Sequence, residues 1–324
     1  MIWFWTKLIL LLVAGLALVV FGADYLVDGA AGIARRFGLS EFVIGLTIVG
    51  MGTSAPEMVV SFIGAIEGNA DISIGNVVGS NIMNVLLILG LTAVILPIAV
   101  TSENRRVDIP LNIIITVLLI LLGLEHTIFG IGTEDGLTQM DGAILLAIFI
   151  GYIWLSFKRN KPDEVEEGTV VKPIGIWRAI MMVVVGLASL IFGGELFVNN
   201  ATEMAHALHI SDKFIAITIL AGGTSMPELA TCVVAAAKKR GQLALGNIIG
   251  SNVFNILLIL GGSALIHPLS FEHINYVDLG VLLLSAFVLL TASLIGKKHK
   301  IDRFDGVFFL LIWASYMAYL IINL

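Results

Sequence analysis

Two glutamates stand inside long apolar stretches of the sequence, where a charged side chain is costly. Glu57 closes the motif GTSAPE and Glu228 closes GTSMPE, and neither apolar core contains a lysine or arginine. An ionisable group at the centre of a bilayer costs about 2.5 kcal/mol or more and usually marks an ion pathway. We therefore expect a proton or a bound cation to balance each acid. The structural alternative is a protonated glutamate that hydrogen-bonds between helices.

Oxygen-bearing groups surround both acids. Thr53 and Glu57 are four residues apart, so a continuous helix would present both on one face. Pro56 lacks a backbone donor and should free the carbonyl of Gly52, and Pro227 repeats this arrangement in the second motif. Carboxylates, hydroxyls and freed carbonyls together predict an all-oxygen cage, which suits a hard cation such as calcium. The hydroxyls of this cage belong to Thr53, Ser54, Thr224 and Ser225.

A polar stripe recurs on two further apolar stretches. In each stretch an asparagine, a serine and a second asparagine follow one another at intervals of four residues, which places them on one helix face. Packing through the neighbouring glycines is the alternative interpretation, and it explains the glycines better than the amides. We expect cation coordination by Ser80, Asn84, Ser251 and Asn255, supported from behind by Asn76, Asn81, Asn247 and Asn252.

All these motifs occur twice at a constant offset of 171 residues. GTSAPE (52–57) returns as GTSMPE (223–228), and GNVVGSNIMN (75–84) returns as GNIIGSNVFN (246–255). If each copy holds five spans, the two copies enter the membrane from opposite sides. That arrangement is typical of secondary transporters, whose sites form from broken helices at the repeat interface. We expect a first five-helix repeat at 1–157, a cytoplasmic linker at 158–175 and a second five-helix repeat at 176–324.

The composition is that of a membrane protein. Of 324 residues, 58% are hydrophobic and 13% are charged, about half the usual share of charges, and the mean hydropathy is +1.01. These values exclude a soluble enzyme, and the net charge of −6 excludes a nucleic-acid binder. The continuous apolar runs predict an all-α polytopic protein with ten transmembrane helices. They fall at 3–27, 41–66, 72–98, 107–124, 142–157, 176–198, 213–237, 243–267, 277–295 and 306–322.

The positive charges predict the orientation of these ten spans. Of the 18 lysines and arginines, all but Lys7 and Lys213 fall on the same side. Since positive loops remain cytoplasmic, we expect a multi-pass plasma-membrane protein with both termini outside the cytoplasm. The single cysteine, Cys232, excludes a disulfide framework and cysteine-based metal centres. We expect no enzymatic activity and no cofactor, with the lipid bilayer and inorganic cations as partners of a functional monomer.

The paired motifs resemble the two alpha-repeats of prokaryotic-type sodium/calcium exchangers, members of the calcium/cation antiporter superfamily. The resemblance implies antiport of sodium against calcium by alternating access, with the first and sixth spans sliding as a gate. It implies a central calcium site formed by Thr53, Glu57, Thr224 and Glu228. It also implies flanking sodium sites that add Ser54, Ser225, Ser80, Ser251 and the carbonyls of Gly50 and Ala221.

Two alternatives stay open on the sequence alone. Calcium/proton antiport would use protons that titrate Glu57 and Glu228, although the GNAxE-type motif of such exchangers is absent from the spans. A cation channel lined by the same oxygens is the second alternative. Potassium co-transport is disfavoured, because Asn255 stands where potassium-dependent relatives carry aspartate.

Overall fold

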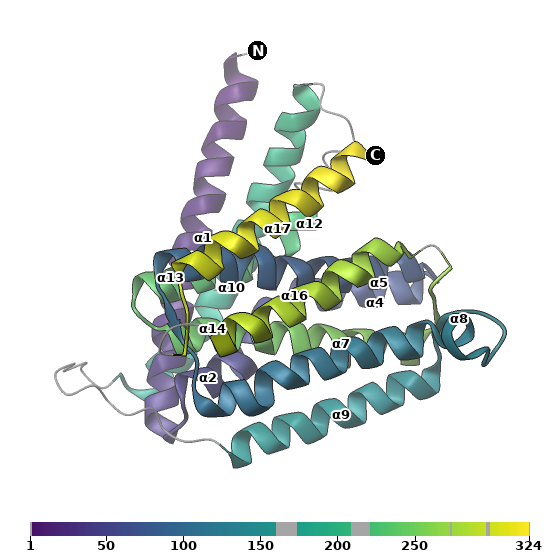
Figure 1. Cartoon of the computed structure of the whole chain (residues 1–324). Coiled ribbons are helices and arrows are strands. Elements are labelled where there is room, and N and C mark those ends of the chain that lie inside the picture. The colour runs from purple at the N-terminus through teal and green to yellow at the C-terminus, as the bar shows by residue number, and fades with distance from the viewer. Residues whose placement is uncertain (1, 160–173, 209–220, 273, 296–298, 324) are drawn as a thin grey trace.

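The computed structural model describes residues 2–159, 174–208, 221–272, 274–295 and 299–323, and every structural statement below concerns this part of the chain. It is helical almost throughout (Figure 1). Eight described helices are long and apolar enough to cross a bilayer. They are Trp3–Phe37, Ala70–Ile95, Asn104–Gly123, Gln139–Lys158, Ile176–Ala207, Gly241–Ile266, Tyr276–Ile295 and Arg303–Ile322.

The two remaining expected spans are the ones that carry the glutamates. The expected span 41–66 is a bent pair, Glu41–Thr53 and Ala55–Ile66, with an angle of 49° between its parts. Of the expected span 213–237, the structure describes α12 (Ala221–Thr224) and α13 (Met226–Ala237). Its beginning lies outside the described residues, as does most of the expected linker at 158–175.

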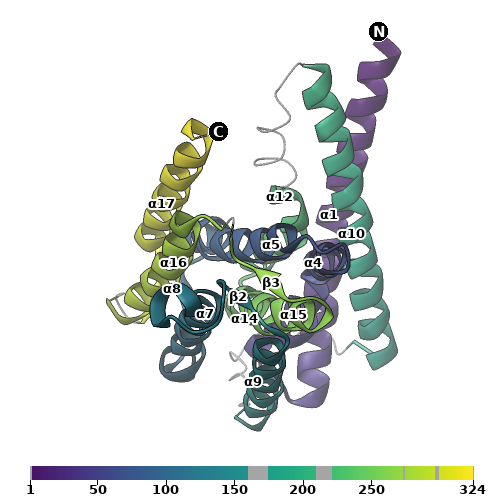
Figure 2. The same cartoon turned by 90° about the vertical axis from the view of Figure 1, so that its right-hand side faces the viewer.

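Helices α1 (Ile2–Phe37) and α10 (Ile176–Ala207) form one flank of the molecule, side by side in both views (Figures 1 and 2). Both continue past the ends expected from hydropathy, because the polar residues that follow are compatible with a helix. α1 ends only at Gly38, whose φ of +64° favours glycine. At the contact, a Cβ on Gly22 would lie 2.7 Å from the carbonyl oxygen of Gly186. The two backbones therefore approach as closely as small residues allow.

The centre of the fold joins the second expected span to the eighth. The second contains α2 (Glu41–Ile44), the π-helical segment η1 (Gly45–Val49), α3 (Gly50–Thr53) and α4 (Ala55–Ile66). The eighth contains α14 (Gly241–Val253), η5 (Phe254–Leu260) and α15 (Gly261–Ile266). A Cβ on Gly246 would lie 2.2 Å from the oxygen of Phe42, so only glycine permits this approach. The apolar window of Gly241–Ile266 is 94% buried, which makes this helix the centre of the bundle.

The third expected span has the same construction as the eighth. It contains α5 (Ala70–Met83), the π-helical segment η2 (Asn84–Leu89) and α6 (Gly90–Ile95). Asn84 opens η2, and its repeat equivalent Asn255 is the second residue of η5. Short π-helical segments inside α-helices occur frequently at functional sites.

The other flank contains η3 (Asn104–Asp108) with α7 (Ile109–Gly123), α16 (Tyr276–Ile295) and α17 (Arg303–Ile322) (Figure 2). Helix α9 (Gln139–Lys158) packs against η5 and α15. The short helix α8 (Glu125–Phe129) follows α7. Two antiparallel strand pairs join the halves of the chain: β1 (Ile98–Ala99) with β4 (Lys300–Ile301), and β2 (Gly136–Leu137) with β3 (Leu269–Ser270). β1 and β3 occupy equivalent positions under the 171-residue offset, and each pairs with the opposite half.

Candidate cation-binding site

Both glutamates follow a break in their helix. α3 ends at Thr53 and α4 begins at Ala55, with Ser54 between them at φ −82° and ψ 9°. Ser225 has nearly the same conformation at the equivalent break, φ −86° and ψ 8°. Thr53 and Glu57 therefore lie on opposite sides of a break, at the place where Pro56 and the neighbouring glycines were expected to interrupt the helix. The backbone N–H of Ser54 donates to the carbonyl oxygen of Gly50 at 3.1 Å.

The two carboxylates are fully buried, and each accepts a hydrogen bond from a serine of the other repeat. Ser54 donates to Glu228 Oε1 at 3.0 Å, and Ser225 donates to Glu57 Oε1 at 3.2 Å. Each motif thus supplies the hydroxyl that binds the acid of the other motif. The ion pairs found among the described residues involve neither glutamate, so their negative charge is left for a cation or proton.

Ser80 connects the first carboxylate to the opposite asparagine. Its hydroxyl lies 3.4 Å from Glu57 Oε1 and 3.2 Å from the hydroxyl of Ser225. It also accepts a hydrogen bond from Asn255 Nδ2 at 3.2 Å. Residues from both repeats therefore meet at this serine, on the face of α5 predicted to carry the polar stripe.

The asparagines of the two stripes also pair across the repeats. Asn84 Nδ2 donates to Asn252 Oδ1 at 3.1 Å, and Asn255 Nδ2 donates to Asn81 Oδ1 at 2.9 Å. Asn81 in turn donates to the backbone carbonyl of Asn252 at 3.2 Å. These four amides are at least 98% buried, so their hydrogen bonds cannot be replaced by bulk water.

Four buried oxygens in this cluster accept no hydrogen bond from any residue that the structure describes. They are Glu57 Oε2, Glu228 Oε2, Asn84 Oδ1 and Asn255 Oδ1. A buried polar atom without a partner costs about 1–3 kcal/mol, and more when it is charged. All four are acceptors, and they form two pairs under the 171-residue offset. The other unpaired buried side-chain atoms in the described chain form no such pairs. Hard cations prefer oxygen ligands, so these four atoms are candidate cation ligands.

The remaining predicted site residues lie around this cluster. Thr53 is buried and donates to Asn247 Oδ1 at 3.2 Å, while the Ser251 hydroxyl lies 3.5 Å from the carbonyl oxygen of Gly50. Ala221 opens α12 and Thr224 closes it, with Thr224 partly exposed. Side-chain hydrogen bonds between described residues reach neither Ala221 nor Thr224. Hydrogen bonds between described residues thus connect ten of the twelve predicted ligands in two groups of five, and each group has members from both repeats.

The expected supporting amides contact groups that the motif analysis did not single out. Asn76 donates to the carbonyl oxygen of Glu57 and to Ser61 Oγ, both at 3.0 Å. Asn247 Nδ2 lies 3.2 Å from Cys232 Sγ. Ser61 and Cys232 are equivalent under the repeat offset, which is the sequence signal that could have identified this contact.

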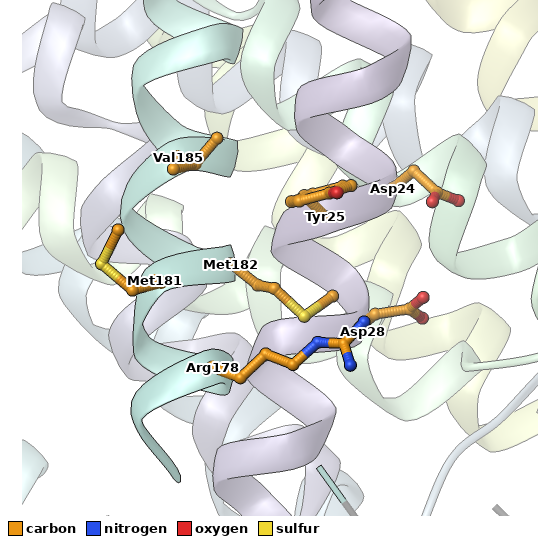
Figure 3. A pocket seen from close by; sticks show the side chains of 7 residues that line it. All are labelled: Asp24, Tyr25, Asp28, Arg178, Met181, Met182 and Val185. Atoms are coloured by element: carbon orange, nitrogen blue, oxygen red, sulfur yellow. The ribbon is translucent and has the colours of Figure 1, made fainter. Parts of the chain in front are cut away.

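A separate cavity of about 360 Å³ lies between α1 and α10 (Figure 3). In Figure 3 the guanidinium of Arg178 points toward Asp28. Next to this cavity, Lys238 Nζ lies 2.7 Å from Asp24 Oδ1 and 2.8 Å from Asp28 Oδ1. It also donates to the backbone carbonyl of Asp24 at 3.2 Å. Lys238 thus links the end of α13 to α1.

The described chain holds no cluster of three or more histidine, cysteine or acidic residues able to bind a metal.

The chain is similar to known proteins over nearly its whole length. The family profile described as sodium/calcium exchanger protein matches residues 7–158 and 178–322. The sodium/calcium exchanger MaX1 of Methanosarcina acetivorans is 32% identical, covering 96% of this chain and 97% of its own. The inner membrane protein YrbG of Escherichia coli is 35% identical, with 86% of each chain covered. A solved structure of the sodium-calcium exchanger NCX_Mj, soaked with 10 mM Na⁺ and zero Ca²⁺, superposes with a TM-score of 0.82. Its sequence identity is 34%, over 96% of this chain and 98% of that one.

Proposed function

Since the chain belongs to the sodium/calcium exchanger family, we propose that it is a secondary antiporter that exchanges sodium for calcium by alternating access. The observation that carries this proposal is the set of four unpaired oxygens on Glu57, Glu228, Asn84 and Asn255. Two of them bear the negative charge that balances a divalent ion, and two are neutral. A site of this composition fits calcium or several sodium ions with the same ligands.

In this proposal the two cargo ions compete for shared ligands. Calcium binds between the two carboxylates and the two threonine hydroxyls, Thr53 and Thr224. Sodium uses the hydroxyls, amides and carbonyls of Gly50, Ser54, Ser80, Asn84, Ala221, Ser225, Ser251 and Asn255. The crossed bonds from Ser54 and Ser225 support this overlap, because each carboxylate already touches a serine of the sodium set. Overlapping occupancy explains how binding of one ion releases the other.

We further propose the ten-span inverted-repeat topology, in a plasma membrane, with both termini outside the cytoplasm. The eight apolar helices and the bent pair support nine of the spans. The strand pairs support the repeat relationship, since the equivalent strands β1 and β3 each pair with the opposite half. The repeats at 1–157 and 176–324 contribute equally to the site, so one chain forms a complete site and can work as a monomer.

Proton coupling is the competing function. A proton needs only the carboxylates, whereas the neutral oxygens of Asn84 and Asn255 would then remain without partners in a buried site. That difference favours sodium as the driving ion.

The test is calcium uptake into sodium-loaded proteoliposomes at clamped pH, with and without an outward sodium gradient. We expect uptake that follows the sodium gradient and does not require potassium. Uptake that ignores sodium and follows an imposed pH gradient would instead establish proton antiport. Flux that needs no counter-ion would indicate a channel.

A further inference from the structure

The side-chain amides in the site have one face that can bind a cation and one that cannot. The oxygen of an asparagine amide is an acceptor and the NH₂ group is only a donor. For Asn255, a half-turn of the amide would direct NH₂ toward the cation and remove a ligand. Some contact must therefore hold the oxygen on the correct side.

A chain of hydrogen bonds in which each donor and each acceptor is determined holds the Asn255 amide in one orientation. The backbone carbonyl of Asn252 can only accept, so the group of Asn81 that faces it at 3.2 Å is the NH₂ group. The oxygen of Asn81 consequently points the other way, where it accepts from Asn255 Nδ2 at 2.9 Å. That contact leaves the oxygen of Asn255 as the buried atom of this amide that has no partner among the described residues. The backbone of one repeat thus determines the amide orientation through two side chains.

We propose that Asn81 is a positioning residue that orients the Asn255 amide so that its oxygen serves as a sodium ligand. The inference rests on the proposed cation site and extends it to a residue that contacts no ion itself. Ser80 is compatible with the same orientation, because it accepts from Asn255 Nδ2. A hydroxyl can also donate, however, so Ser80 alone does not determine which atom of the Asn255 amide faces it. Asn81 does specify it, because its own amide is fixed by the carbonyl of Asn252.

The test measures ion binding directly, so that it does not depend on the exchange assay. Cations that bind the folded protein raise its melting temperature, and a titration with NaCl or CaCl₂ gives the midpoint for each ion. In Asn81→Ala we expect the sodium midpoint to rise about tenfold, as for loss of one ligand to a charged group. The calcium midpoint should change less. The melting temperature without added ions should stay near that of the matched control Asn112→Ala, another buried asparagine.

A second background separates orientation from packing. In Asn255→Asp both carboxylate oxygens are acceptors, so either orientation presents an oxygen to the cation. Asn81 is then not needed to orient this side chain. Adding Asn81→Ala to this background should change the sodium midpoint less than twofold. An equal loss in both backgrounds would reduce Asn81 to a packing role and overturn the proposal. So would an unchanged sodium midpoint in the single variant.

Asn81→Leu keeps the side-chain volume without polar atoms and replaces Asn81→Ala if that variant does not purify as a folded protein. A parent protein that binds sodium in this titration but shows no sodium-driven calcium flux would contradict the proposed function and leave this inference standing.

Discussion

Ser54 of the first repeat donates a hydrogen bond to Glu228 of the second at 3.0 Å, and Ser225 returns the contact to Glu57 at 3.2 Å. Neither carboxylate is bound by the serine of its own motif in these contacts. The charge of one repeat is therefore held by the broken helix of the other. Displacing either broken helix changes the surroundings of both acids at once.

Replacing either acid by its amide should abolish calcium transport. Glu57→Gln and Glu228→Gln each remove one of the two charges that balance a divalent ion, and they keep the shape of the side chain. Calcium uptake into sodium-loaded proteoliposomes should fall to background for both purified variants, while Glu134→Gln, an exposed acid, should transport as the parent does. Parental rates in either variant would remove that carboxylate from the transport mechanism.

Loss of the stripe serines should affect sodium more than calcium. Ser80→Ala and Ser251→Ala remove neutral oxygens next to Glu57 and Gly50, and a monovalent ion depends on such ligands most. We expect the sodium concentration for half-maximal exchange to rise about tenfold. The matched control is Ser73→Ala, which removes a buried hydroxyl of α5 that donates to the backbone of Ser61. Equal losses for both ions would argue against separate sodium ligands.

Gly246→Ala should destabilise the fold. The added methyl group would lie 2.2 Å from the carbonyl oxygen of Phe42, so α14 and α2 would have to separate. Overpacking of this kind costs about 1–3 kcal/mol or more. Melting in detergent and elution as a single species measure the effect. Gly280→Ala is the control, because its added methyl group meets no described atom within 4 Å. Equal melting temperatures for the two variants would contradict the contact.

Lys238→Gln should weaken the attachment of α1 to α13. Lys238 is 25% exposed and its acidic partners are more exposed, so each ion pair contributes only about 0.2–1 kcal/mol. We expect a decrease in melting temperature of about 2 °C that diminishes at high salt. The exposed neighbour Lys239→Gln serves as the control. Combining Lys238→Gln with Asp28→Asn should cost less than the sum of the single effects, and strict additivity would contradict the pairing.

Cysteine labelling tests the orientation. In a Cys232→Ser background, Glu134→Cys should react with an impermeant reagent in intact cells, and Glu166→Cys should react only after the cytoplasmic side is opened. The reason is the segregation of lysine and arginine, which predicts that residues 158–175 are cytoplasmic. Labelling of Glu166→Cys in intact cells would reverse the topology.

The duplicated motifs predict the composition of the candidate site, because identical residue types at a fixed offset identify equivalent positions. Glu57, Glu228, Asn84 and Asn255 are buried, and their role as ligands stays a prediction. The crossed pairing of Ser54 with Glu228 could not be predicted, since local spacing relates Ser54 only to its own motif. Contacts between residues 174 positions apart depend on how the two broken helices pack.

Hydropathy located the membrane helices but not their ends. α1 continues to Phe37, since residues 28–37 contain no proline and glycine appears with a positive φ only at Gly38. Asp24, near the end of the first expected span, is half exposed and pairs with Lys238 at 2.7 Å. Local spacing could not predict this contact, because Lys238 belongs to the other repeat.

The crossed contacts also determine the order in which the protein can be completed during synthesis. Glu57 leaves the ribosome 168 residues before Ser225, its hydroxyl donor, and β1 emerges long before its partner strand β4. A nascent first half therefore carries the Glu57 carboxylate with Ser80 beside it but without the hydroxyl of Ser225, so one half of the gene cannot encode the complete set of contacts. Folding must remain incomplete until the last helices are inserted, which makes the whole chain, and not the repeat, the unit that quality control in the membrane has to recognise.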